Sequence, residues 1–188
     1  MPTRGALPQA LVQAGVTLLD EEGVEGLTLR RVASRAGVSH AAPAHYFEGL
    51  PGLRQAIATR GFQIFQSALR DAMAAPAASP RARLLAVVNA YSDFAARHYG
   101  LFSLMFQEIE NPSAALREAA LESYGLFSEC VAPLAGDRDP LVLESAIWAM
   151  AHGYGILGMS GRADRTHVAP PFEALLDLLI PCEPAAPA

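Results

Sequence analysis

The chain has 188 residues, a hydrophobic fraction of 52% and a formal net charge of −5. A chain of this size can bury well over half of the surface of its unfolded form, which together with the apolar composition excludes intrinsic disorder. The negative charge argues against a protein that coats nucleic acid without sequence preference. Two cysteines, Cys130 and Cys182, are too few for a disulfide scaffold or a zinc site, and we expect both to be reduced thiols without an assigned role.

The sequence carries no targeting or membrane signal. Its N-terminus lacks the apolar segment of a signal peptide. The longest apolar run, 147–159, is interrupted by His152 and is too short to span a membrane. These features predict a cytoplasmic protein with no membrane partner.

The first helix is predicted to begin at Pro8, because proline is favoured in the first turn of a helix. Apolar residues then recur at helical spacing until Gly23 ends the pattern. We expect this helix to support the segment that follows it.

The stretch from Thr28 to Phe47, TLRRVASRAGVSHAAPAHYF, carries two short helical patterns joined by a turn. Thr28 is a candidate N-cap of the first pattern, and Gly37 stands where helices commonly end in a left-handed residue. Ser39 is the candidate N-cap of the second pattern, with Pro43 near the end of its first turn. This arrangement is typical of a helix-turn-helix, although similar helix pairs also occur in proteins that do not bind DNA.

The second of these helices is slim enough to enter the major groove of B-DNA. His40 and His45 supply hydrogen-bonding rings, and the methyl groups of Ala41, Ala42 and Ala44 could contact thymine methyl groups. The pattern therefore favours direct contact between this helix and base edges.

Positive charge collects in the same region of an otherwise acidic chain. Between residues 28 and 54 stand four arginines and a single acid, namely Arg30, Arg31, Arg35, Arg54 and Glu48. Arginine binds phosphates and guanine edges with paired N–H donors, so this local charge favours a nucleic-acid partner.

Helical patterns also fill the remainder of the chain. After breaker residues at 48–52, a long pattern from Leu53 to Met73 is predicted to connect the N-terminal segment with what lies behind it. A loop at 74–79 and a polar loop at 160–171 separate further patterns at 80–98, 99–109, 113–133, 141–159 and 172–179. The sequence predicts an all-α fold of about nine helices, with a three-helix domain at 1–52 and a larger helical domain at 53–188.

The motif AGVSHAAP followed by HYF, with a T-x-x-x-V-A segment before it, resembles the DNA-binding domain of the tetracycline-repressor (TetR) family of bacterial regulators. The resemblance covers residues 7–55 in its motifs and the remainder only in layout. It implies a helix-turn-helix DNA-binding domain, a C-terminal ligand-binding and dimerisation domain, and double-stranded operator DNA as a partner.

The resemblance also indicates which residues would contact DNA. We expect base contacts from His40, Ala41, Ala42 and His45, and phosphate contacts from Thr28, Arg30, Ser39, His45 and Tyr46. Family members often carry tyrosine and lysine at phosphate-contacting positions where this chain has Ala44 and Leu50.

Trp148 and His152 stand four residues apart, and therefore on one helix face, within an apolar helix pattern. Glycines at 153, 155 and 158 would let another backbone approach closely. The W-x-x-x-H-G pattern resembles the C-terminal domain of the WHG-type branch of the family, which implies a homodimer through Leu141–Met159 and Phe172–Leu179. The alternative is an ordinary core helix with a hydrogen-bonded histidine.

Aromatic and polar side chains of the larger domain are candidates for the effector cavity that the family resemblance implies, although most of the aromatic residues should form the core. The candidates are Phe62, Phe65, Asn89, Phe94, His98, Phe102, Phe106, Tyr124, Phe127, Trp148 and His152. The expected effector is a small apolar or amphipathic molecule.

No motif of an enzyme is present: the sequence lacks G-x-S-x-G, a P-loop and H-E-x-x-H. His40 and His45 are five residues apart, which does not align them for a metal ion. The leading hypothesis is therefore a ligand-responsive transcriptional regulator without cofactor or metal, most commonly a repressor in this family, that binds a palindromic operator as a homodimer. The alternative is a helical small-molecule or partner-binding protein with weak or lost DNA reading.

Overall fold

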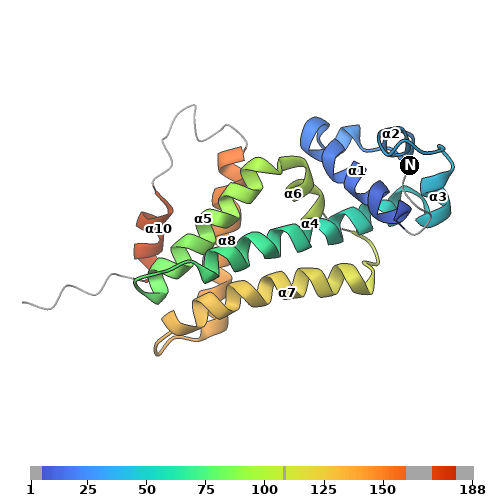
Figure 1. The fold of residues 1–188 in the computed structure, drawn as a ribbon. Helices are drawn as coiled ribbons and strands as arrows, with labels where there is room; N and C mark the ends of the chain where they lie inside the picture. The colour runs from blue at the N-terminus through green and yellow to red at the C-terminus, as the bar shows by residue number, and fades with distance from the viewer. Residues whose placement is uncertain (1–5, 108, 160–170, 181–188) are drawn as a thin grey trace, which may run out of the picture. The chain divides into compact units, whose positions relative to one another are not determined.

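Helices form the regular structure of the residues that the computed structural model describes, which are 6–107, 109–159 and 171–180. These residues contain nine α-helices, two short 3₁₀ helices and no strand, which confirms the all-α prediction (Figure 1). The α-helices are α1 (Leu7–Glu22), α2 (Leu29–Arg35), α3 (Ala42–Tyr46), α4 (Gly49–Ala74), α5 (Pro80–Arg97), α6 (Tyr99–Met105), α7 (Ala114–Val131), α8 (Pro140–Met159) and α10 (Phe172–Leu179). The 3₁₀ helices are η1 (Val24–Gly26) and η2 (Ala132–Leu134). Within the described ranges, no helix has both the length and the apolar character needed to cross a membrane.

The chain divides into two compact units, and each unit is assembled from two separate stretches of the sequence. The first consists of Met1–Ser67 and Arg97–Ser123, and the second of Ala68–Ala96 and Tyr124–Ala188. Two of the three boundaries between the units fall inside long helices, α4 and α7, and the third lies before the last residue of α5. The first part of α4 and all of α6 therefore belong with the helix-turn-helix. The functional boundary between residues 52 and 53 is a different kind of division, and it stays a prediction.

Helix α1 begins and ends where the sequence predicts. Pro8 lies within its first two positions, and Gly23 follows its last residue with a φ of 70°, a conformation that glycine adopts at little cost. The helix contacts both α2 and α6. Gly100 of α6 lies so close to α1 that a Cβ atom there would overlap the carbonyl oxygen of Leu19. Only a residue without a side chain allows this approach.

Helix α3 begins later than predicted. Its N-terminal cap position is Ala41, whose side chain makes no capping hydrogen bond. Instead, the carbonyl of Ser39 accepts a hydrogen bond from the N–H of Ala42 at 3.0 Å, which closes a turn before the helix. Pro43 then occupies one of the first two helical positions, where its missing N–H leaves no bond unmade. The predicted capping role of Ser39 is therefore wrong.

Helix α4 begins earlier than predicted, at Gly49 rather than Leu53. Gly49 has a φ of 75°, so it turns the chain into the helix in a conformation that other residues rarely adopt. Pro51 falls in the first turn, where a helix does not need the backbone N–H. Residues 49–52, which belong to the segment expected to break a helix, therefore form the first turn of α4.

The second unit is built from α5, α8, α10 and the C-terminal parts of α4 and α7. Its fully buried side chains include Tyr91, Phe127, Ile147 and Leu176. Ser79 caps α5 as predicted, because its Oγ accepts a hydrogen bond from the N–H of Ala82 at 3.1 Å. The final helix has the predicted bounds, whereas the loop predicted at 160–171 lies outside the described residues except for Pro171.

Candidate DNA-binding and ligand-binding sites

Local hydrogen bonds fix the geometry of the helix-turn-helix. The Oγ1 atom of Thr28 accepts a hydrogen bond from the N–H of Arg31 at 3.3 Å, which confirms the predicted cap of α2. At the other end of α2, the N–H of Val38 donates to the carbonyl of Ala33 at 3.0 Å, and Gly37 has a φ of 68°. This is the Schellman arrangement, in which a left-handed glycine satisfies carbonyls at a helix end. It determines how the chain leaves α2 and enters the turn.

The residues predicted to contact DNA are largely exposed. Thr28, Arg30, Ser39, His40, Ala41 and His45 are exposed, and Ala42 and Tyr46 are half-buried. Pro43 is buried and holds α3 against the rest of the unit. The rings of His45 and Tyr46 meet edge to face with their centroids 5.1 Å apart. Residues 39–45, apart from the buried Pro43, therefore present a strip of small and imidazole side chains to solvent, which we call the exposed strip.

The local positive charge is weaker than the sequence indicates. Arg31 forms an ion pair with Glu22, and Arg35 forms one with Glu21, so acids at the end of α1 neutralise both arginines. Arg30 is exposed and has no ion-pair partner among the described residues. Helix α2 thus offers one arginine to a phosphate, where the sequence counts three.

The third acid at the end of α1 also has a partner. The Nδ1 atom of His98 lies 3.0 Å from an Oδ2 oxygen of Asp20, which joins the start of α6 to the end of α1. Acids at a helix C-terminus are unfavourable because of the helix dipole, and these contacts compensate for that cost. His98 was a predicted ligand contact, and the structure places it at this junction between two helices.

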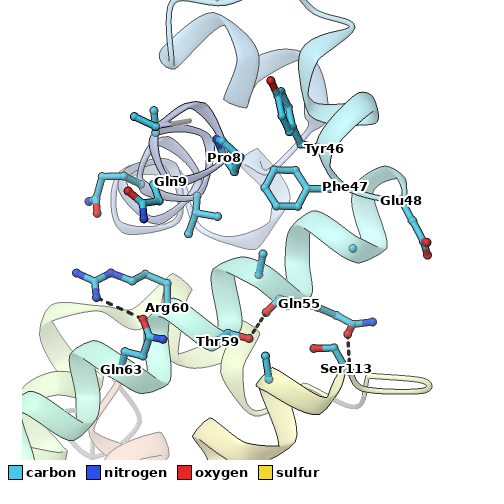
Figure 2. Close-up of a pocket in the computed structure, with 17 residues that line it drawn as sticks. Pro8, Gln9, Tyr46, Phe47, Glu48, Gln55, Thr59, Arg60, Gln63 and Ser113 are labelled. Carbon is cyan, nitrogen blue, oxygen red and sulfur yellow. Dashed lines mark hydrogen bonds between the residues drawn. The ribbon is translucent and has the colours of Figure 1, made fainter. Parts of the chain in front are cut away.

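A groove of about 1040 Å³ opens in the first unit between α1, the segment after α3, α4 and the start of α7 (Figure 2). Figure 2 shows the Phe47 ring pointing toward Pro8 of α1. Gln55 accepts a hydrogen bond from the N–H of Ser113 at 2.7 Å, on the side of the groove formed by α4 and α7. Tyr46 also lines the groove, so one predicted phosphate contact is shared with this surface.

Five of the predicted ligand contacts lie in the first unit, namely Phe62, Phe65, His98, Phe102 and Phe106. Phe62, Phe65 and Phe102 are at most 5% exposed. The Phe106 ring lies 4.6 Å from that of Phe102 and 5.7 Å from that of Phe62, measured between centroids. The structure thus gathers three of the phenylalanines into an aromatic cluster, and His98 contacts α1 instead.

The other six lie in the second unit, namely Asn89, Phe94, Tyr124, Phe127, Trp148 and His152. The Trp148 ring contacts the Tyr124 ring edge-on at 6.2 Å and stacks on His152 at 5.6 Å, again between centroids. Asn89 is exposed on α5, whereas Phe94 and Phe127 are buried. The structure brings together Tyr124, Trp148 and His152, which we call the Trp148 cluster.

Burial controls protonation at one end of the Trp148 cluster. The hydroxyl of Tyr91 lies 2.7 Å from Nδ1 of His152. Loss of solvation lowers the pKa of His152 and raises the pKa of Tyr91, so both groups are neutral near pH 7. If the hydroxyl donates to Nδ1, the imidazole proton resides on Nε2.

Two polar residues beside the Trp148 cluster were missed by sequence reasoning. Glu144 of α8 is 5% exposed, and its Oε2 atom accepts a hydrogen bond from Oγ of Ser128 at 2.7 Å. Its Oε1 atom is buried and has no hydrogen-bond partner among the described residues. Hydrogen bonding to Glu144, together with partial burial, raises the pKa of Tyr124. Glu144 is the single charged residue of α8, and that signal could have identified it from the sequence.

The histidine, cysteine and acidic side chains of the described residues do not gather into larger groups. Among these residues, no group of three or more such side chains could hold a metal ion. Cys130 is a free, buried thiol whose pKa is raised by burial, and Cys182 lies outside the described residues.

A capped helix, a Schellman turn and an exposed short second helix at the start of an all-helical chain define the helix-turn-helix class of DNA-binding proteins. Comparison with known families narrows this class. A model of the bacterial regulatory proteins of the tetR family matches residues 11–62, and a model of the tetracyclin repressor-like C-terminal domain matches residues 84–181. The chain therefore belongs to the TetR family of bacterial regulators, a family of transcriptional regulators rather than enzymes. The W-x-x-x-H-G motif lies within the second match.

Individual relatives agree with this assignment. The HTH-type transcriptional regulator BetI of Burkholderia mallei (strain NCTC 10229) is 39% identical over 83 residues, which are 44% of this chain and 43% of that protein. The match thus spans less than half of the length of this curated relative. A protein of unknown function from Rhodococcus sp. RHA1 is 31% identical, with a TM-score of 0.77 over 94% of this chain and 93% of the other. The regulator FadR from Bacillus subtilis, solved with stearoyl-CoA, shares the fold at 14% identity, with a TM-score of 0.62 over 92% and 97% of the two chains.

Proposed function

We propose that this protein is a ligand-responsive transcriptional regulator that binds a palindromic operator as a homodimer and acts as a repressor. The observation that carries the proposal is the exposed strip at residues 39–45, held in place by the capped α2 and its Schellman turn. Family membership supports the same function. The strip has the size and chemistry of a helix start that enters a major groove.

We assign base contacts to the exposed strip and phosphate contacts to the strip and its neighbours, with His45 in both sets. His40 and His45 can donate or accept hydrogen bonds at base edges, and the methyl groups of Ala41 and Ala42 suit the thymine methyl. Phosphate contacts are assigned to Thr28, Arg30, Ser39, His45 and Tyr46. Because Arg31 and Arg35 are already paired with acids, Arg30 carries most of the charge that α2 contributes. We therefore expect a weaker dependence of affinity on salt than three free arginines would give.

Exposed apolar side chains support dimerisation through the last helices. Five of them lie on α8 and α10 and are 42–78% exposed: Leu141, Val142, Ile156, Leu157 and Leu178. Helix α8 also buries Leu143, Ile147 and Ala151 in its own unit, so it is apolar around much of its circumference. A helix of this kind is normally buried on all sides, which a second copy of the chain would achieve. We assign the dimer contact to Leu141–Met159 and Phe172–Leu179.

Regulation follows from the spacing of the two helix-turn-helix units. A homodimer must place them about 34 to 36 Å apart to enter successive major grooves. Helix α4 runs through both compact units of the chain, so it is a covalent route from one to the other. An effector that favours another spacing weakens DNA binding by population shift. We assign the effector to the second unit, near the Trp148 cluster.

Selection of duplexes from a random library, followed by affinity measurement at moderate salt, tests the DNA-binding function. A palindromic site should emerge and should bind at least about a thousandfold more tightly than random DNA. In the His40→Ala variant, the preference at one base pair should fall by roughly 1 to 3 kcal/mol if His40 contacts a base. Asn89→Ala, which changes an exposed residue of α5, is the matched control and should leave the preference unchanged. An unaltered preference in His40→Ala would remove that residue from the set of base contacts.

A second candidate function is a ligand-binding or partner-binding protein that has lost DNA reading. The ion pairs that neutralise Arg31 and Arg35 favour it, as do Ala44 and Leu50 at positions where the family often carries phosphate-binding side chains. The same measurement separates the two. Equal affinity for the selected and the random duplex would eliminate the regulator and leave this alternative.

A further inference from the structure

The most unusual group in the second unit is the carboxylate of Glu144. Its side chain is 5% exposed, its Oε1 atom has no hydrogen-bond partner, and it forms no ion pair with any described residue. A buried carboxylate is costly unless it is both paired and hydrogen-bonded. Ser128 and Tyr124 are neutral donors to this carboxylate, so its charge has no described cation beside it, and Oε1 has no hydrogen-bond partner among the described residues.

The side chains around Glu144 do not supply the missing charge. Tyr124 and Ser128 of α7 are neutral donors, and Trp148 lies one turn further along α8. His152, two turns from Glu144, stacks on Trp148 and hydrogen-bonds to Tyr91. Because burial lowers the pKa of His152, this imidazole is neutral near pH 7. Compensation by a cation would have to come from outside this group of side chains.

The rings beside the carboxylate indicate what accompanies that cation. Tyr124 of α7 and Trp148 of α8 are in edge-to-face ring contact, and both side chains are only half-buried. Aromatic faces attract cations and also pack against alkyl chains. A carboxylate next to such rings therefore suits an organic cation that carries an apolar portion.

We propose that Glu144, Ser128, Tyr124 and Trp148 form the binding site for a protonated amine with an apolar chain. The ammonium pairs with the carboxylate and donates a hydrogen bond to Oε1, while the alkyl portion contacts the two rings. A quaternary ammonium satisfies the charge but has no N–H for Oε1, so it binds less tightly than a protonated amine. As the site of the effector, this assignment rests on the proposed regulatory function, but binding itself can be measured without DNA.

The chain offers its own optical reporter for this site, since Trp148 is the single tryptophan. The full-length protein is titrated with n-octylamine, which is protonated at pH 7, and with n-octanol, octanoate and octyltrimethylammonium, all below their micellar concentrations. We expect a saturable change of Trp148 fluorescence with the amine, and affinities for the alcohol and the carboxylate that are about tenfold or more weaker. The quaternary ammonium should fall between the amine and the alcohol. Equal affinity for amine and alcohol would overturn the proposal.

Two variants test whether the Glu144 carboxylate itself, rather than the acidic surface of the protein in general, binds the amine. Glu144→Gln keeps the size and the bond to Ser128 but removes the charge, so affinity for the amine should fall about tenfold or more while affinity for the alcohol stays the same. Glu129→Gln removes an exposed acid of α7 and should bind the amine as the parent does. Unchanged selectivity in Glu144→Gln would refute the assignment. If this variant does not fold, the ligand series on the parent protein still decides.

The result is independent of the DNA-binding function. Selective amine binding without any preferred DNA sequence would support this inference and eliminate the regulator. A preferred operator together with no selectivity for the amine would support the regulator and eliminate this inference. Release of the selected duplex by the amine, absent in Glu144→Gln, would support both.

Discussion

Ala44 in the exposed strip and Leu50 after it stand where family members often carry phosphate-contacting side chains, so we expect them to weaken binding to a phosphate backbone. Ala44 is exposed on α3, and Leu50 is half-buried in the first turn of α4. Neither offers a hydrogen bond, and Arg31 and Arg35 are neutralised by acids of α1. We therefore expect the proposed phosphate contacts of this unit to rest mainly on Arg30 and on uncharged donors.

Leu50→Lys should restore one phosphate contact. The aliphatic part of lysine can retain the packing of Leu50 while its ammonium reaches solvent, so the fold should tolerate the change. Affinity for the selected duplex should rise, and the slope of log affinity against log salt should steepen by about 0.9. Fluorescence anisotropy over a range of salt concentrations measures both quantities. Leu121→Lys adds the same charge to an exposed position of α7 and should leave the slope unchanged.

The protonation of His152 should make stability depend on pH. Burial lowers its pKa in the folded state, so the unfolded chain, with a histidine pKa of about 6.5, binds a proton more readily. The free energy of unfolding should therefore fall as pH drops below about 6.5, and this loss should stop growing below the lowered folded pKa. Urea unfolding between about pH 7 and pH 5 should show a shallower loss in His152→Gln. Identical pH profiles for parent and variant would contradict this role of burial.

Predictions for single residues are confirmed where they depend on interactions between neighbours in the sequence. The cap by Thr28 and the positive φ of Gly37 depend on neighbours within a few positions, and both are confirmed. The ion pairs of Arg31 and Arg35 join residues of separate helices, so spacing alone could not reveal them. The residues assigned to DNA and effector contacts stay predictions.

At the scale of helices, sequence reasoning placed most elements and misjudged two starts. The segment 48–52 was expected to break a helix but contains the start of α4. Gly49 adopts a positive φ at the first residue, and Pro51 lies in the first turn, where its missing N–H breaks no helical hydrogen bond. The turn at 39–42 is closed by a backbone carbonyl of Ser39 rather than its hydroxyl. Proline and glycine mark a helix boundary reliably, but the side of the boundary on which they fall depends on the neighbouring packing.

The junction of α1 with α6 depends on a glycine. A methyl group at Gly100 would overlap the carbonyl oxygen of Leu19, whereas one at Gly125 of α7 meets no atom within 4 Å. Gly100→Ala should therefore destabilise the fold by about 1 to 3 kcal/mol, because the backbones must separate. Gly125→Ala should stabilise it by about 0.5 to 1 kcal/mol, since alanine favours a helix. Urea unfolding of both variants compares the two, and equal stability would show that the close approach at α6 is not required.

At the scale of the whole molecule, the compact units and the expected functional domains divide the chain differently. The helix-turn-helix shares its unit with α6 and with parts of α4 and α7. Sequence patterns report on contiguous segments, so they cannot predict a unit assembled from separate stretches. This assembly has a functional consequence, because α6 connects to the end of α1 through His98 and Gly100. The helix-turn-helix is thereby supported by residues far from it in the sequence.

Dimerisation is the whole-molecule property on which the proposed spacing mechanism depends. Leu178 of α10 is 78% exposed, and a symmetric dimer would bury it once in each subunit. Leu178→Glu should weaken the dimer by roughly 3 kcal/mol or more, because two leucine side chains lose their burial and two charges enter the contact. Leu121→Glu changes a leucine of α7 that is 70% exposed, and it should leave the dimer intact. Sedimentation equilibrium at micromolar concentration measures both. If the parent is monomeric there, or if the two variants associate equally, the dimer contact does not lie on α10 and the spacing mechanism fails for this surface.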